Sequence, residues 1–243
     1  EAAPCLEALK NRSPKGTILI IDSGSSLYGQ NCECDYACIL CAKTYRQMGY
    51  EVAIMNNGPW DVASDFGYAD RLYIEPVTAE DVMNVVYMEN PVGVVTVFGG
   101  EEAVNLVKFL EQQEVKILGA NAEAAFISKN LVTAQNFMTS SEFEVNLISD
   151  SKSIFIPGIM ERFISEEKDV VEVYPTFNLS DVLREAMIKK STEIALKLEV
   201  RGLLTIRFIN YNNDLYIKEV SPVVSGNIPF ISKITGLPVV SYA

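Results

Sequence analysis

The chain has 243 residues, which is enough for one large domain or two small ones. Its composition, 49% hydrophobic and 21% charged, is typical of a globular protein with a substantial core. A formal net charge of −12 argues against nucleic acid and anionic membranes as main partners. The sequence has no histidine, which excludes Ser-His and Cys-His nucleophile pairs and His-ligated zinc sites.

The sequence pattern favours a cytoplasmic protein. We find no stretch with the pattern of a secretory signal peptide and no apolar run of transmembrane length. Four of the five cysteines fall between Cys32 and Cys41, which is not the spacing of a disulfide framework in a secreted fold. We therefore expect a reducing environment.

The first half of the chain alternates short apolar runs with amphipathic segments, after a lead-in over residues 1–14 that shows no periodicity. We predict strands at Thr17–Ile21, Glu51–Met55, Gly93–Phe98 and Val115–Leu118. We predict helices at Asp35–Met48, after the cap residue Thr78, and at Glu101–Gln113. This alternation predicts a parallel sheet over residues 15–120, with helices on both faces and any ligand at the carboxyl ends of the strands.

The second half follows a different pattern, in which strands dominate. Residues 121–142 are predicted to connect the two halves and to be helical at least at their start. A helix is expected at Leu179–Val200, capped by Ser180. Strands are expected at Glu144–Ser149, Ile154–Ile156, Val170–Tyr174, Leu203–Phe208 and Leu215–Val220. Residues 143–243 are therefore predicted to form a mostly antiparallel sheet.

The last predicted strand has an unusual acidic residue. Strict alternation would put Leu215, Ile217 and Glu219 on one face, so that an acid continues an apolar face. Glu219 is then either a solvated residue at a frayed strand end or a carboxylate that binds a hard cation such as Mg²⁺.

The stretch from Arg201 to Gly236 resembles a known family. Its RGL, EV-P, PF-SK and TG elements occur in the same order in the second synthetase half of the carbamoyl-phosphate synthase large chain, a member of the ATP-grasp superfamily. Asp22–Ile39 and Gly58–Pro76 resemble the pre-ATP-grasp domain of that family, and so does VFGGEEAVNL, Val97–Leu106. The resemblance implies a Rossmann-like pre-ATP-grasp domain followed by a truncated ATP-grasp large lobe.

The resemblance also implies ATP and Mg²⁺ as cofactors, but the positions that would hold them have changed. The three metal ligands of the family fall on Arg207, Glu219 and Ser221, and only the glutamate is kept. A guanidinium at position 207 would compete with a metal for Glu219. Two phosphate-clamping arginines fall on Val223 and Gly226, and most of the family's small lobe has no counterpart near Ser141. We therefore expect that ATP and Mg²⁺ binding has been lost.

Other positions of the family pattern also carry different residue types in this chain. An arginine of the pre-ATP-grasp pattern falls on Leu27, and Glu101 and Glu102 replace a Gln-Thr pair. Glu161 remains as a second carboxylate of the large lobe.

Two further motifs each allow a structural and a functional interpretation. Glycines and a glutamine in the first half could cradle a phosphate, or the glycines could simply form tight turns between strands and helices: Gly24, Gly29, Gln30, Gly99 and Gly100. The four clustered cysteines could bind zinc or an iron–sulfur cluster, or Cys38 and Cys41 could pack as small apolar residues: Cys32, Cys34, Cys38 and Cys41.

The sequence thus supports one main hypothesis and three rivals. The main hypothesis is a degenerate carbamoyl-phosphate synthase-like unit that is not catalytic by itself and docks on a protein partner, either a synthetase half or a second copy of the chain. The rivals are an ATP-dependent ligase completed by another chain, a cysteine-ligated metal protein, and a small-molecule sensor that keeps only the Rossmann-like cleft.

Overall fold

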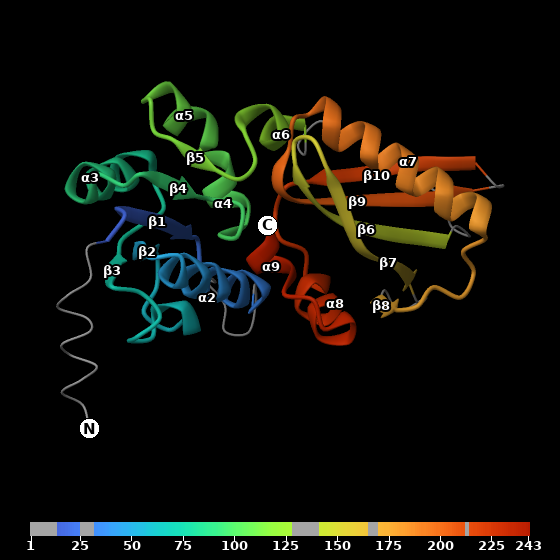
Figure 1. Ribbon diagram of the computed structural model, residues 1–243, viewed down its shortest axis with the longest axis horizontal. Helices are drawn as coiled ribbons and strands as arrows, with labels where there is room; N and C mark the ends of the chain where they lie inside the picture. The colour runs from blue at the N-terminus through green and yellow to red at the C-terminus, as the bar shows by residue number, and fades with distance from the viewer. Residues whose placement is uncertain (1–13, 25–31, 128–140, 165–169, 212–213) are drawn as a thin grey trace.

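The computed structural model describes residues 14–24, 32–127, 141–164, 170–211 and 214–243. Two five-stranded sheets lie side by side, and the C-terminal helices lie between them (Figure 1). No helix within these residues is long and apolar enough to cross a membrane.

The first sheet is parallel, with strand order β3-β2-β1-β4-β5. Its strands are β1 (Thr17–Asp22), β2 (Glu51–Asn56), β3 (Arg71–Ile74), β4 (Gly93–Val95) and β5 (Ile117–Leu118). β1 and β4 lie at the point where the strand order reverses, which is where doubly wound sheets bind ligands. The predicted parallel sheet is confirmed. β3 was not predicted, because this edge strand is short and has no fully buried residue.

Helices cover both faces of this sheet, as predicted. On one face Ile18, Ile20 and Ile54 pack against α2 (Cys32–Gln47), and on the other Leu19, Ile21 and Met55 pack against α3 (Ala79–Glu89). Successive residues of a strand point to opposite faces, so each strand contributes to both layers. The hydroxyl of Thr78 accepts a hydrogen bond from the amide of Asp81, which confirms it as the cap of α3.

Several predicted elements of this half are wrong in extent: the helix predicted from Asp35 begins at Cys32, and the strand predicted at Val115–Leu118 is only Ile117–Leu118. The helix expected at Glu101–Gln113 is two short helices, α4 (Gly100–Asn105) and α5 (Val107–Gln112), because the helical hydrogen-bond pattern breaks at Leu106. The strand expected to reach Phe98 ends at Val95, since the chain turns at residues 96–99 and the Gly99 amide donates to the Thr96 carbonyl. The 3₁₀ helix η1 (Val62–Ser64) and α6 (Ala122–Ile127) complete this part.

The second sheet is antiparallel throughout, with order β10-β9-β6-β7-β8. Its strands are β6 (Ser141–Asp150), β7 (Ile154–Ile164), β8 (Val170–Val173), β9 (Arg201–Tyr211) and β10 (Asp214–Ser221). Four of the five are longer than predicted, and β7 in particular continues past Ile156 through a bulge. Helix α7 (Asp181–Lys197), capped by Ser180 as predicted, lies along one face (Figure 1).

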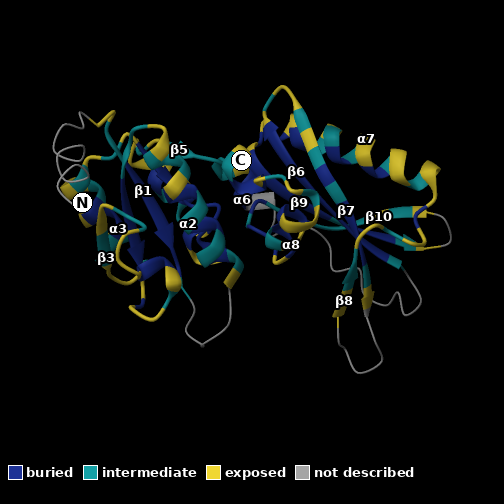
Figure 2. Cartoon of the chain, turned by 60° about the horizontal axis from the view of Figure 1, so that its bottom comes forward, coloured by how far each residue is buried: buried dark blue, intermediate teal, exposed yellow. Residues whose placement is uncertain are grey.

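The two sheets share one core. Helices α8 (Asn227–Thr235) and α9 (Val239–Tyr242) pack against α2, and one apolar cluster joins Ile18 and Cys38 to Ile206 and Ile231. Figure 2 shows the buried strands of both sheets. The end of the chain therefore ties the antiparallel part to the parallel one.

Candidate functional site

A β-bulge in β10 determines where Glu219 points. Ile217 pairs with Phe208 and Glu219 pairs with Arg207, with the register shifting between them. Because Phe208 and Arg207 are consecutive residues of β9, they point to opposite faces of the sheet. The prediction that Glu219 shares a face with Leu215 and Ile217 is therefore wrong: the extra residue turns it to the other face.

On that face Arg207 lies between two carboxylates. Its Nη1 is 2.8 Å from Oε2 of Glu219, and its Nε is 3.0 Å from Oε2 of Glu144. The Glu144 side chain is 1% exposed, whereas those of Arg207 and Glu219 are 30% and 39% exposed. Burial opposes the charge on Arg207, but the carboxylates of Glu144 and Glu219 outweigh it and raise the pKa of Arg207 further.

Glu144 is the buried centre of this cluster, which we call the arginine cluster. It accepts hydrogen bonds from four side chains: Asn146, Arg207, Ser225 and Asn227. Burial would raise the pKa of Glu144, but the hydrogen bonds from Ser225, Asn227 and Asn146 and the charge of Arg207 together lower it. Glu144 is thus an ionised carboxylate with its acceptor positions already used.

The rest of the face repeats this pairing of acid and base. Lys218 Nζ lies 2.5 Å from Oε1 of Glu142, and Arg162 Nε lies 3.5 Å from Oε1 of Glu172. Burial and then the charge of Glu144 raise the pKa of Glu172, while Arg162 lowers it. The bulge puts Lys218 and Glu219 on the same side, so Glu219 reaches Arg207 on the adjacent β9 and Lys218 reaches Glu142 on β6, one strand further.

The other positions implied by the resemblance also lack metal or phosphate ligands. Ser221 lies opposite Thr205 on β9, and its hydroxyl accepts a hydrogen bond from the Val223 amide, 3.2 Å away. Val223 packs against a small apolar cluster around Val107. A side chain at Gly226 would meet no atom within 4 Å, so this position is open.

Glu161 is not part of the arginine cluster. It lies opposite Phe143 on the face covered by α7, and it is fully buried. Its Oε2 accepts from the amides of Phe177 and Asn178, at 2.7 and 3.0 Å, and its Oε1 accepts from the Asn178 side chain at 2.8 Å. Glu161 therefore anchors the segment between β8 and α7.

The side chains of the arginine cluster do not form a site for a divalent metal. Both nearby carboxylates already bind the Arg207 guanidinium, which carries a permanent charge. Within the described residues, no group of three or more Asp, Glu, Cys or His side chains is arranged to hold a metal ion.

The second predicted site lies at the carboxyl ends of β1 and β4. Gly99 must be a glycine, since a Cβ there would lie 1.9 Å from the Ile21 carbonyl oxygen. Gly24 and Gly100 have φ of +63° and +79°, the left-handed region that favours glycine. The Ser23 amide donates to the Gly99 carbonyl at 3.0 Å. These glycines close a tight turn against a neighbouring strand; Gly29 and Gln30, and also Leu27, lie outside the described residues.

Asp22, at the end of β1, is a buried acid that forms no ion pair within the described part of the chain. Its Oδ1 accepts from the Gly24 amide at 3.2 Å, and its Oδ2 accepts from Asn56 at 3.3 Å. Burial, with smaller contributions from Asp35 and Asp61, raises the pKa of Asp22 to about 7. Asp35 shows the same effect to a lesser degree: burial and then Asp61 raise its pKa.

The clustered cysteines lie mostly in the core. Cys34, Cys38 and Cys41 are buried on the sheet side of α2, and Cys32 is exposed. The Cys38 thiol lies 3.6 Å from the Phe98 carbonyl oxygen, and burial raises its pKa well above the usual range. This arrangement is the apolar packing considered for Cys38 and Cys41, and Cys34 shares it.

Sequence reasoning marked Arg207 but missed Glu144 and its other partners, Asn146, Ser225 and Asn227. The signal was present in SEFEVNLISD, where Glu142, Glu144 and Asn146 alternate with Phe143, Val145 and Leu147. That alternation marks a strand with one polar face. The contacts of Ser225 and Asn227 left no such signal, because they come from a distant helix start.

Comparison with known proteins identifies the family. The family model of the carbamoyl phosphate synthase preATP-grasp domain matches residues 14–126. The model of the carbamoyl-phosphate synthase L chain, ATP binding domain, matches residues 84–243.

The fold also occurs in biotin-dependent carboxylases. The chain superimposes with a TM-score of 0.72 on the biotin carboxylase domain of a single-chain bacterial carboxylase, at 12% identity, over 93% of this chain and 66% of that one. The TM-score is 0.71 for Rhizobium etli pyruvate carboxylase, at 15% identity, over 93% and 25% of the chains. These identities support the fold alone.

Relatives by sequence are carbamoyl phosphate synthase large chains. The protein from Clostridium beijerinckii is 30% identical over 303 residues, 93% of this chain and 28% of the relative. One from Clostridium botulinum is 30% identical over 98% of this chain and 29% of its own length. The chain thus spans a little over a quarter of these relatives. Since the second family model covers well over half of its residues, the chain belongs to the carbamoyl-phosphate synthase large-chain family.

Proposed function

We propose that this chain is a carbamoyl-phosphate synthase large-chain-like unit that is not catalytic by itself and acts as a structural or regulatory partner of another domain. The observation that carries the proposal is the position of Arg207, whose guanidinium binds Glu144 and Glu219 at the sheet position that corresponds to the family's metal site. Phosphoryl transfer needs divalent cations to bridge and neutralise the phosphates. A single fixed positive charge cannot bridge two phosphates in that way.

Displacing the guanidinium from Glu144 would be costly. A metal that took Glu219 from Arg207 would leave Arg207 with Glu144 alone, and one that took Glu144 would also have to compete with Ser225, Asn227 and Asn146. The second route carries the larger cost, because removing one partner of a buried ion pair typically costs about 3–5 kcal/mol. The arginine cluster is therefore better suited to hold the sheet and α8 together than to exchange cations.

The missing lobe supports the same proposal. The alignment with the Clostridium beijerinckii relative spans 303 residues, which is more than the 243 residues of this chain. The relative therefore carries positions that have no counterpart here. We propose residues 15–120 as the pre-ATP-grasp domain, 121–142 as a link in place of the small lobe, and 143–243 as the large-lobe remnant.

A partner domain is part of the proposal. The matched relatives are several times longer than this chain, so the unit corresponds to one segment of a larger assembly. The partner we propose is a synthetase half or a second copy of this chain. The cytoplasmic location remains a prediction.

One observation favours the enzymatic rival. The Arg207 and Glu219 side chains are partly exposed, so a lobe supplied by another chain would reach them. In that case Arg207 would move aside and Glu219 would bind the metal of MgATP.

ATP hydrolysis by the purified chain and by Glu219→Ala, with and without Mg²⁺, tests the proposal. We expect no turnover that depends on Glu219. Magnesium-dependent turnover that disappears in Glu219→Ala would overturn the proposal and favour the enzyme. Equal background turnover in both proteins would come from contamination and would leave the proposal standing.

A further inference from the structure

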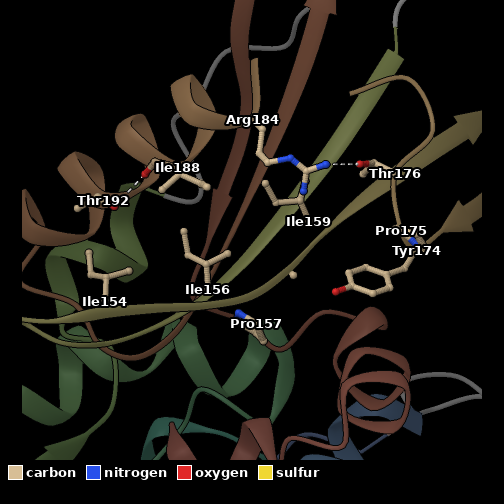
Figure 3. A pocket seen from close by; sticks show the side chains of 11 residues that line it. Ile154, Ile156, Pro157, Ile159, Tyr174, Pro175, Thr176, Arg184, Ile188 and Thr192 are labelled. Atoms are coloured by element: carbon tan, nitrogen blue, oxygen red, sulfur yellow. Dashed lines mark hydrogen bonds between the residues drawn. The ribbon is translucent and has the colours of Figure 1, made fainter. Parts of the chain in front are cut away.

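A cavity of about 400 Å³ lies on the opposite face of the antiparallel sheet from the arginine cluster. It lies between β7, α7 and the segment Tyr174–Thr176 (Figure 3). Ile159 of its floor pairs with Val145 of β6, which pairs with Ile206, the neighbour of Arg207. Neighbouring residues of a strand face opposite ways, so Ile159 and the arginine cluster lie on opposite faces of the sheet.

A bulge in β7 shapes the floor. Gly158 pairs with Asn146 and Phe155 pairs with Ile148, so Ile156 and Pro157 together oppose a single residue of β6. Both line the cavity. A bulge bends its strand and redirects side chains, which explains how two consecutive residues border one space.

The far wall is held in place by two features. A Cβ on Gly158 would lie 2.8 Å from Cε2 of Tyr174, so the tyrosine ring lies against the strand only because residue 158 is a glycine. The buried Glu161 carboxylate binds the Phe177 and Asn178 amides and so fixes the chain just beyond Thr176. The cavity is thus built by specific residues on both sides.

The charge in this cavity is positive. Arg184 projects from α7 toward Thr176, with its Nη2 3.4 Å from the threonine hydroxyl, and the Tyr174 hydroxyl points back over Pro157 (Figure 3). Arg46, Arg71, Arg162 and Arg207 all pair with carboxylates, but among the described residues Arg184 forms no ion pair. A guanidinium without a carboxylate is a donor available to an anion.

We propose that this cavity binds a small organic carboxylate with a compact apolar body. The carboxylate would accept from Arg184, and the apolar body would lie on Ile156, Ile159 and Ile188. Ligand pockets combine apolar walls with a few placed polar groups in this way, and this volume lies at the small end of their usual range, about 300–1,000 Å³. The proposal does not depend on whether the chain is catalytic.

The test compares 3-phenylpropanoate with its neutral amide by amide-resolved NMR titration of the full chain. We expect the carboxylate to bind about ten-fold or more tightly than the amide, with shifts centred on Ile156 and Ile188, because a charge-assisted hydrogen bond is present only for the acid. Equal affinity of the two probes, no binding of either, or shifts centred elsewhere would overturn the proposal.

Two variants locate the charge. Arg184 is exposed, so the Arg184→Gln variant is expected to fold. It should bind 3-phenylpropanoate no more tightly than the neutral amide. Lys189→Gln removes the same charge from an exposed residue of α7 that does not line the cavity, and it should keep the preference. If the preference survives in Arg184→Gln, or disappears equally in both variants, Arg184 is not the anion-binding residue.

Discussion

The two sheets hold buried carboxylates in opposite ways. In the antiparallel sheet, Glu144 is buried beside a guanidinium and three neutral donors, and the pKa of Glu144 is lowered. In the parallel sheet, Asp22 is buried with amide donors and near two further acids, and its pKa is raised to about 7. Burial penalises the charge in both places, so the difference comes from the partners.

This difference determines how each region neutralises its buried carboxylate. The arginine cluster is neutralised internally and needs no added cation, whereas the end of β1 carries a carboxyl that is half protonated near neutral pH. Substitutions in the arginine cluster should therefore destabilise the protein by removing hydrogen-bond and ion-pair partners. The effect of substituting Asp22 on stability should depend on pH.

The largest effect is expected from Glu144→Ala. The substitution removes the buried partner of Arg207 and leaves Ser225, Asn227 and Asn146 without their acceptor, so we expect about 3–5 kcal/mol of lost stability in urea unfolding. Glu219→Ala is the matched control, because it removes the more exposed carboxylate of the same guanidinium and should cost about 1 kcal/mol or less. Equal losses in the two variants would show that burial of the pair is not decisive.

A smaller loss is expected from Gly99→Ala. The added Cβ would overlap the Ile21 carbonyl oxygen at 1.9 Å, and the backbone of β1 would have to shift, at a cost of about 3 kcal/mol. Gly226→Ala meets nothing within 4 Å and should change the free energy of unfolding by less than about 0.5 kcal/mol. A Gly99→Ala protein as stable as the parent would contradict the close packing of β1 and residue 99.

Asp22→Asn should change the pH dependence of stability, which distinguishes the end of β1 from the arginine cluster. Because the pKa of Asp22 is raised, its folded state favours the protonated form, and the parent loses stability as pH rises from about 4 to 7. The variant lacks this loss. We compare the free energy of unfolding of the variant with that of the parent, by urea unfolding at pH 5 and at pH 8. The difference, variant minus parent, should be about 2 kcal/mol more positive at pH 8 than at pH 5. The same relative stability at both pH values would mean that Asp22 does not titrate in this range.

The smallest effect is expected at the cysteines. Cys38→Ser places a hydroxyl in the core beside the Phe98 carbonyl and should cost about 1–2 kcal/mol, whereas Cys32→Ser, at an exposed position, should cost less than about 0.5 kcal/mol. Metal analysis of the parent should find no stoichiometric zinc or iron. Stoichiometric metal that is lost in Cys32→Ser would revive the metal-binding rival.

Much of the fold could be predicted from the sequence, because hydrophobic periodicity marks strands and helices directly. The buried run TILII and the capped segment after Thr78 are examples. The break at Leu106 could not be predicted, since Glu101–Gln113 keeps helical periodicity across it. Local patterns do not show where a helix must bend to follow the sheet.

The candidate site could be predicted only in part, for a related reason. The resemblance marked Arg207 and Glu219, but the face that Glu219 occupies depends on a bulge that alternation alone does not reveal. The Glu144 contacts join residues about 60 to 80 positions apart, and only the fold brings them together. The cavity beside α7 arises from consecutive elements, but its floor depends on a bulge at residues 156–157 that alternation does not reveal.

Calorimetric titration of the chain with ATP, with and without Mg²⁺, tests the central claim most directly. The claim is that Arg207 occupies the place of a metal and leaves Glu144 and Glu219 unable to bind one. We predict no ATP binding that depends on Mg²⁺. ATP binding that becomes tighter when Mg²⁺ is added, and that weakens in Glu219→Ala, would contradict the account and show that the carboxylate still binds a metal.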